Sequence, residues 1–329
     1  MLGHLPHAMA AVGLVLALSV PGSAAGQAWP NRPVTMVIPF GAGSGVDVLG
    51  RVLAQPLSEI LGQQVLVENV AGAGGMTGTA RVAKAVADGS VFVLGNVGTH
   101  ALNPTLYRKP LYNVVDDFAP VVLIGDTPQV LIARADLPVN NLPEFVTYLK
   151  ANQARMQYGS PGIGSAAPLG CVLLNSAVQV EVTHVPYRSG GAAMQDLMAG
   201  RLDYQCPLLA IALPQIESKK VKALAVLTRN RVAVLPGLAS AHEQGLTDFE
   251  VSAWNAFFFP HGTPPAIVQR LHDATVAALN SSAVQTRLQQ VGAEPSSPDR
   301  RSPDYMQGFI AGEIKKWAAV VKAAGVNAE

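Results

Sequence analysis

A glycine-rich loop between a short apolar run and a helical pattern most constrains what this chain can fold into. The apolar run spans Val34 to Ile38, the loop spans Phe40 to Gly45, and apolar residues recur at helical spacing from Val48 onward. A short apolar run followed at once by an amphipathic helix is typical of a buried parallel strand. The sequence therefore predicts an α/β fold.

The same order of run, loop and helix occurs twice more. VENVAGAGGMTG (residues 67–78) and YGSPGIGSAAPLG (residues 158–170) each follow an apolar run and lead into a helical pattern. Such loops bring backbone N–H groups and a positive helix N-terminus close to a ligand, which favours a carboxylate or a phosphate. For any single loop a plain tight turn is the alternative. Three loops of one kind predict one shared cleft that binds a small anion.

The charge of the chain argues against nucleic acids and anionic membranes as partners. The formal net charge is +1, only 14% of residues are charged, and Lys and Arg are scattered without a basic run. Nucleic acid and anionic membranes need a basic patch. We therefore expect a small-molecule ligand, no nucleic-acid partner, and a monomer.

The first 25 residues resemble an export signal. Residues 8–20 form an uncharged, mostly apolar run, and small residues follow up to Ala25. This run is shorter than the ~20 residues that a transmembrane helix needs. The positively charged start of a typical signal is missing, since only His4 and His7 stand there. We predict a cleaved signal peptide over residues 1–25 and hence an exported protein.

The length of 329 residues suggests two domains. The middle of the chain shows its own alternation of strands and helices, and two apolar segments, residues 116–138 and 251–259, can carry the chain between the units. The predicted first domain combines residues 27–128 with 254–329, and the second spans 129–253.

Two cysteines, Cys171 and Cys206, are present. They can form a disulfide that closes a loop of ~35 residues, or remain buried free thiols. The sequence leaves both alternatives open.

The sequence contains no motif that is typical of a catalytic or a metal-binding site. Neither Ser44 nor Ser160 lies in a G-x-S-x-G elbow, and H-E-x-x-H, C-x-x-C and P-loop motifs are missing. A G-x-G-x-x-A at residues 162–167 with Glu181 downstream is a weak dinucleotide motif, because Glu181 falls in mid-strand. We predict no enzyme activity, no cofactor and no metal.

Several ordered stretches resemble a known family. VIPFGAGSGVD, VENVAGAGGMTG, YGSPGIGS, HVPYRSGGAAMQDLMAGRLDY, LAVLTRNR and FFFPHGTPPAIVQRL resemble the tripartite tricarboxylate transporter solute-binding receptors, often called Bug proteins. The resemblance implies a two-domain periplasmic binding protein of Venus-flytrap type (type II-like), with a small mono- or dicarboxylate held in the cleft between the domains. It also implies delivery to a membrane permease. A sensor that signals through a two-component kinase is the alternative.

The resemblance also implies a set of ligand-binding residues. On the first domain these are Phe40, Gly41, Ser44, Asp47, Gly72, Gly74, Gly75, Thr99 and His100, and on the second they are Ser160, Gly164, Ser165, Ala166, Tyr187 and Asp203. Thr99 and His100 also follow an apolar run, where α/β sheets bind ligands. Asp47 is unusual beside a carboxylate, and capping its own helix is the alternative role.

Two departures from the family pattern concern selectivity. Where many relatives read P-F-x-x-G-G-x-x-D, this chain has Gly45-Val46-Asp47 after Ser44, which changes the order of hydroxyl and glycine in the first loop, and where many carry a His it has Pro168. The three glycine-rich loops contain no Arg or Lys. We therefore expect backbone N–H dipoles to neutralise the ligand's charge.

Overall fold

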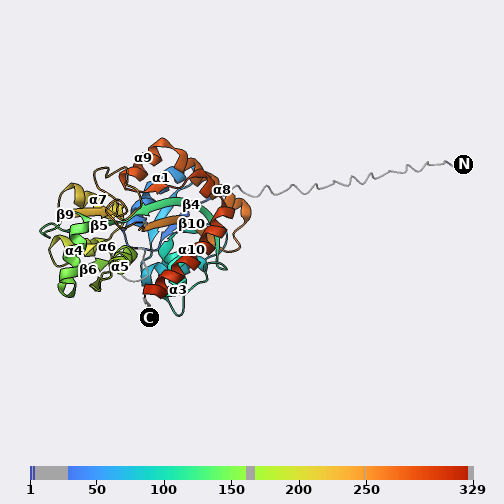
Figure 1. Cartoon of the computed structure of the whole chain (residues 1–329). Coiled ribbons are helices and arrows are strands. Elements are labelled where there is room, and N and C mark those ends of the chain that lie inside the picture. The colour runs from blue at the N-terminus through green and yellow to red at the C-terminus, as the bar shows by residue number, and fades with distance from the viewer. Residues whose placement is uncertain (2, 4–28, 161–166, 248, 325–329) are drawn as a thin grey trace.

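The computed structural model describes residues 1, 3, 29–160, 167–247 and 249–324. Two β-sheets, each flanked by helices, form two lobes that lie side by side (Figure 1). Lobe 1 contains the six-stranded sheet and lobe 2 the five-stranded sheet. The α/β fold class predicted from the glycine-rich loops is confirmed.

The sheet of lobe 1 has the strand order β11-β4-β10-β3-β1-β2. β1, β2 and β3 are parallel, whereas β10 runs antiparallel to both β3 and β4. The apolar run expected to be a buried strand is β1, with four of its five residues buried. The strands are β1 (Val34–Ile38), β2 (Val65–Asn69), β3 (Val91–Asn96), β4 (Phe118–Pro128), β10 (Ser252–Pro260) and β11 (Glu294–Pro295).

Helices cover both faces of this sheet, and each face has its own apolar core. One core contains Leu53 of α1 and Leu271 of α8, and the other contains Met306 and Trp317 of α10. The helices are α1 (Gly45–Leu61), α2 (Met76–Ala83), α3 (Asn103–Leu106), α8 (Pro265–Asn280), α9 (Ser282–Gln290) and α10 (Pro303–Ala324), with short turns at Ala73–Gly75, Gly98–Leu102 and Pro298–Arg300. No helix within the described ranges is long and apolar enough to cross a membrane.

The sheet of lobe 2 has the order β7-β6-β8-β5-β9. β6 runs parallel to β7 and β8, and β5 runs antiparallel to β8 and β9. The strands are β5 (Val130–Arg134), β6 (Gln157–Ser160), β7 (Thr183–Pro186), β8 (Tyr204–Gln205) and β9 (Val221–Val226). The helices are α4 (Leu142–Asn152), α5 (Ala167–Val178), α6 (Gly190–Met198) and α7 (Leu209–Glu217), with a 3₁₀ turn at Gln153–Arg155.

The chain crosses between the lobes twice, and the crossings are hydrogen-bonded to each other. Gln129 separates β4 from β5, and Val251 precedes β10. The Gln129 N–H donates to the Val251 carbonyl at 3.3 Å, the Leu227 N–H donates to Gln129 at 2.8 Å, and the Val251 N–H donates to Leu227 at 2.6 Å. Gln129 and Val251 fall within residues 116–138 and 251–259, and the division of the chain into two domains stays a prediction.

A disulfide fastens two elements of lobe 2. Cys171 of α5 is bonded to Cys206, which directly follows β8, and both residues are buried. Of the two alternatives that the sequence leaves open, the structure has the disulfide.

Candidate functional site

A cavity of about 390 Å³ is lined by residues of both lobes. Lobe 1 contributes the loops before α1 and α2 and the end of β3, and lobe 2 contributes the start of α6 and two residues around the start of α7. The lining residues are Pro39, Phe40, Gly41, Ser44, Gly45, Val46, Ala71, Gly72, Ala73, Gly74, Gly75, Asn96, Tyr187, Arg188, Ser189, Gly190, Leu208 and Ile211. We call this cavity the cleft.

The lobe 1 wall is built around the N-termini of α1 and α2. Ser44 caps α1, because its hydroxyl accepts a hydrogen bond from the Asp47 N–H at 3.2 Å. Gly72, Gly74 and Gly75 have φ angles of 144°, 62° and 91°, which L side chains rarely adopt. A Cβ at Gly75 would lie 2.7 Å from Cγ2 of Thr99. Glycine is therefore required for the close approach of this loop to the end of β3.

The lobe 2 wall is the N-terminus of α6. Ser189 caps this helix by accepting from the Ala192 N–H at 3.2 Å, and Tyr187 donates its hydroxyl proton to Asp196 at 2.7 Å. Arg188, between Tyr187 and Ser189, is exposed and lines the cleft. The expectation that N–H dipoles alone supply positive charge is therefore wrong: the start of α6 adds a guanidinium that the three glycine-rich loops lack.

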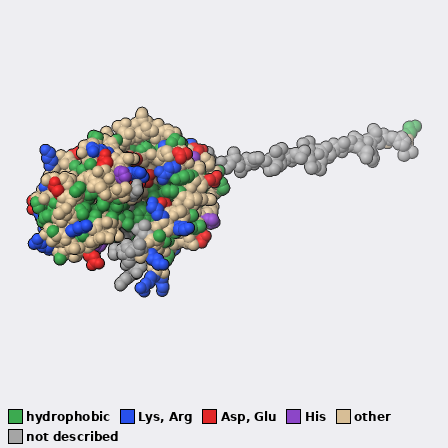
Figure 2. Space-filling model, viewed as in Figure 1, with side chains coloured by type: hydrophobic (Ala, Val, Ile, Leu, Met, Phe, Trp, Pro, Cys, Tyr) green, Lys and Arg blue, Asp and Glu red, His purple; other side chains and the backbone are tan. Residues whose placement is uncertain are grey.

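Apolar side chains separate these polar groups. Pro39, Phe40 and Val46 line the cleft from lobe 1, and Leu208 and Ile211 line it from lobe 2. In the space-filling view, hydrophobic side chains gather over the middle of the molecule, between the two lobes (Figure 2). The cleft therefore combines an apolar body with backbone and side-chain donors, as small-molecule sites commonly do.

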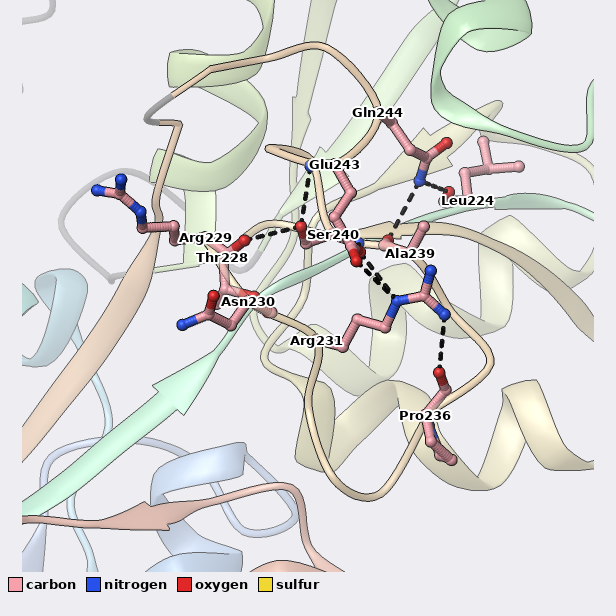
Figure 3. A network of polar contacts seen from close by, with 10 residues as sticks. All are labelled: Leu224, Thr228, Arg229, Asn230, Arg231, Pro236, Ala239, Ser240, Glu243 and Gln244. Atoms are coloured by element: carbon pink, nitrogen blue, oxygen red, sulfur yellow. Dashed lines mark hydrogen bonds and ion pairs between the residues drawn. The ribbon is translucent and has the colours of Figure 1, made fainter.

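A second cavity, of about 500 Å³, adjoins the crossings and is more strongly charged. Its charged side chains largely pair with each other or with nearby groups. Arg300 contacts Asp126 at 3.3 Å. Arg231 contacts Glu243 at 2.9 Å, and Glu243 also accepts a hydrogen bond from the Ser240 N–H (Figure 3). The Arg231–Glu243 pair holds the loop after β9, and the Arg300–Asp126 pair lies in lobe 1. The cleft, where the N-termini of three helices meet, is the better candidate site.

Seven of the predicted site residues lie together along the cleft: Phe40, Gly41, Ser44, Gly72, Gly74, Gly75 and Tyr187. Gly164, Ser165 and Ala166 lie outside the described residues. The remaining five, Asp47, Thr99, His100, Ser160 and Asp203, are described and do not line the cleft. Their contacts indicate what they do instead.

Asp47 is 3% exposed and supports the first glycine-rich loop from inside. Its carboxylate accepts from the Gly43 N–H at 2.8 Å, from Asn69 at 2.9 Å and from Arg51 at 3.0 Å. Burial raises the pKa of Asp47, but these hydrogen bonds outweigh burial and hold the pKa below its usual value. Asp47 therefore stays ionised and holds the loop from the first turn of α1, whereas the residue that caps this helix is Ser44.

Thr99 and His100 are fully buried behind the cleft. The His100 ring stacks on Phe258 with centroids 3.8 Å apart, and its Nδ1 lies 2.8 Å from the Thr99 hydroxyl. Burial lowers the pKa of His100 to about 3, so the imidazole is neutral at physiological pH. In this structure the pair belongs to the support of the wall.

Ser160 and Asp203 are engaged within lobe 2. The Ser160 hydroxyl lies 2.6 Å from Nε2 of His184, and Asp203 contacts Arg134 at 3.2 Å and accepts from the Gln157 N–H at 2.8 Å. The contact with His184 was not predicted, because no sequence motif joins these residues. Among the described residues, no group of three His, Cys, Asp or Glu side chains could hold a metal ion.

The residues that line the cleft without having been predicted include Asn96, Arg188, Leu208 and Ile211. A sequence signal existed for Asn96, which ends an apolar run where α/β sheets bind ligands. No such signal marks the other three, because their direction depends on how lobe 2 faces lobe 1.

Comparison with known proteins gives a family and several solved structures. A family model described as the tripartite tricarboxylate transporter family receptor matches residues 49–326. The structure of the periplasmic binding protein BugD is 37% identical, covering 92% of this chain and all of its own, with a TM-score of 0.86. MatC from Rhodopseudomonas palustris with bound malate is 37% identical over 89% of this chain and all of its own (TM-score 0.84). Another R. palustris protein, with adipate, is 34% identical over 91% of this chain and 99% of its own (TM-score 0.87).

Proposed function

We propose, from the premise that this chain belongs to the tripartite tricarboxylate transporter receptor family, that it captures a small carboxylate in the cleft and delivers it to a membrane permease. The ligand is a mono- or dicarboxylic acid. The protein acts in the periplasm, after removal of residues 1–25, and carries out no covalent chemistry.

One observation carries this proposal: the N-termini of three helices, α1 and α2 from lobe 1 and α6 from lobe 2, meet along one cleft. Each such terminus favours an anion by about 0.3–1 kcal/mol, and by up to ~2 kcal/mol where it is partly buried. Arg188 adds a positive charge, and among the described residues no Asp or Glu lines the cleft. The cleft therefore selects negative charge.

The relatives support the class of ligand. MatC holds malate and the second R. palustris protein holds adipate, which are both small dicarboxylic acids. The family description names a tricarboxylate transporter, which supports delivery to a permease rather than to a sensor kinase. The apolar lining from Val46, Leu208 and Ile211 suits an acid with a hydrocarbon portion.

Capture involves closure of the two domains, 27–128 with 254–329 and 129–253, about the crossings. Gln129, Leu227 and Val251 form a narrow hydrogen-bonded connection, and hinges of this kind absorb backbone rotation at a few residues. Small-angle scattering with and without a tight ligand tests the closure. An unchanged radius of gyration with the ligand bound would show that closure does not take place.

Native mass spectrometry tests the proposed function itself. The protein is purified from the periplasm of cells that express the full chain, and anything released on denaturation is identified. A released carboxylate supports the receptor. A protein that releases no ligand and shows no thermal shift with any acid of a carboxylate panel contradicts the receptor function. Turnover of a bound acid would show instead that the protein is an enzyme.

A further inference from the structure

Asn96 is a buried polar residue at the edge of the cleft. It is the last residue of β3, its exposed fraction is 1%, and it nevertheless lines the cleft. The glycine-rich turn before α2 lies beside it, since Gly75 closely approaches Thr99. Asn96 is therefore positioned to contact a ligand that enters between the lobes.

The orientation of the Asn96 amide is fixed by Thr99. The Thr99 N–H lies 3.1 Å from Oδ1 of Asn96, and an N–H can only donate, so the atom that faces it must be the oxygen. In return the Asn96 N–H donates to the Thr99 hydroxyl at 3.0 Å, and the Tyr112 hydroxyl donates to the Thr99 carbonyl at 2.6 Å. With Oδ1 held in this way, Nδ2 is the side-chain atom left for other partners.

Nδ2 of Asn96 makes no hydrogen bond with any residue that the structure describes. Asn255 pairs with Asn96 in the register of β10 and β3, and its Oδ1 has no partner among the described residues. Nδ2 of Asn255 donates to the Thr127 hydroxyl and the Ala253 carbonyl, and no hydrogen bond joins the Asn96 and Asn255 amides. Because Asn96 lines the cleft, this donor is available to an acceptor that enters from outside the chain.

We infer that Nδ2 of Asn96 donates a hydrogen bond to a carboxylate oxygen of the ligand, with Thr99 as the positioning residue that aims it. The inference rests on the proposed function and names a residue that determines its specificity. Nδ2 has N–H donors only, so it donates to carboxylate and carbonyl oxygens and disfavours an ammonium group at the same position. This explains why Thr99, predicted as a ligand contact, lies buried behind the wall instead.

The test compares variants of Asn96 with a matched control at Asn255. Asn96→Asp keeps the size of the side chain and the acceptor for Thr99 but replaces the donor with an oxygen. Asn96→Ala removes both, and Asn255→Ala removes the equally buried amide of the neighbouring strand, which does not line the cleft. Affinity for malate, adipate and the acids of a wider panel is measured by calorimetry, and folding by thermal denaturation without ligand.

We expect Asn96→Ala to lower the affinity for the most tightly bound acid about 10- to 150-fold, which is the range for losing one hydrogen bond to a charged group. Asn96→Asp lowers this affinity further, and Asn255→Ala keeps it within twofold of the wild-type value. Nuclear magnetic resonance spectra of the wild-type protein add a second measurement of the contact. The side-chain amide signal of Asn96, assigned by its loss in Asn96→Asp, shifts when the acid binds.

Two results overturn the inference in different ways. If the wild-type protein binds an acid while the Asn96 variants keep its affinity, or the Asn96 amide signal does not move, Asn96 is not a contact and the receptor function stands. If the wild-type protein binds no acid of the panel, the proposed function fails and the inference fails with it.

Discussion

Reduction of the disulfide is a perturbation whose effect follows directly from the structure. Cys171 and Cys206 are 35 residues apart, and they are the only cysteines of the chain. The bond restricts the unfolded chain by closing this loop. In the chain-entropy model a loop of that length contributes about 4 kcal/mol to the free energy of unfolding at 25 °C. Both cysteines are buried, so the reduced thiols remain packed and the loss falls mainly on the unfolded state.

We therefore expect the reduced protein to unfold with a free energy about 4 kcal/mol lower, and with a melting temperature lower by roughly 10 °C. Chemical denaturation is followed by circular dichroism with and without reductant, and the mass after alkylation establishes the number of free thiols. The double variant Cys171→Ala/Cys206→Ala serves as the control, because reductant cannot change its stability. A fully reduced protein that lost less than about 1 kcal/mol would refute the loop-closure argument.

Three further predictions concern the cleft and its support. Gly75→Ala is expected to lower the melting temperature, because Gly75 has a φ of 91° and the added Cβ would clash with Thr99. Gly41→Ala, whose Cβ would contact no atom within 4 Å, is expected to leave the melting temperature unchanged. Equal melting temperatures for the two variants would contradict this prediction. Arg188→Gln is expected to weaken carboxylate binding about two- to fivefold at low salt, which is the range for an exposed charge, as measured by calorimetry. Arg155 is also exposed, and Arg155→Gln serves as the control that leaves the affinity unchanged. Asp47→Asn is expected to cost roughly 1.5–3 kcal/mol at pH 7. Because the pKa of Asp47 is lowered in the folded state, its contribution to the free energy of unfolding is present above pH ~4 and is lost as the pH falls through that lowered pKa. The denaturation curves of wild type and variant are therefore expected to converge in acid. A difference in stability that stayed constant with pH would contradict this prediction.

Sequence patterns predicted the architecture because each glycine-rich loop is a local signal. An apolar run, a loop that needs positive φ angles and a helix start can be recognised without knowing the rest of the chain, and the loop at Gly72 to Gly75 has such angles. The export signal stays a prediction, because residues 4–28 lie outside the described ranges.

The site was predicted less completely, because the direction of a side chain depends on tertiary contacts. Asp47 and Thr99 occupy the positions that the family resemblance gives, yet hydrogen bonds turn both into the wall. Asn96 and Arg188 line the cleft because a neighbouring turn and the start of α6 direct them there. Their role, like that of the seven predicted residues along the cleft, stays a prediction until a ligand is bound.

Calorimetric titration with matched ligands tests the central claim most directly. Each carboxylic acid of a panel that includes malate and adipate is compared with the neutral amide of the same skeleton. We expect at least one acid to bind with a stoichiometry of one and its amide to bind at least tenfold more weakly, since the helix N-termini and Arg188 favour negative charge. A panel in which no acid binds, or in which acid and amide bind equally, would contradict it.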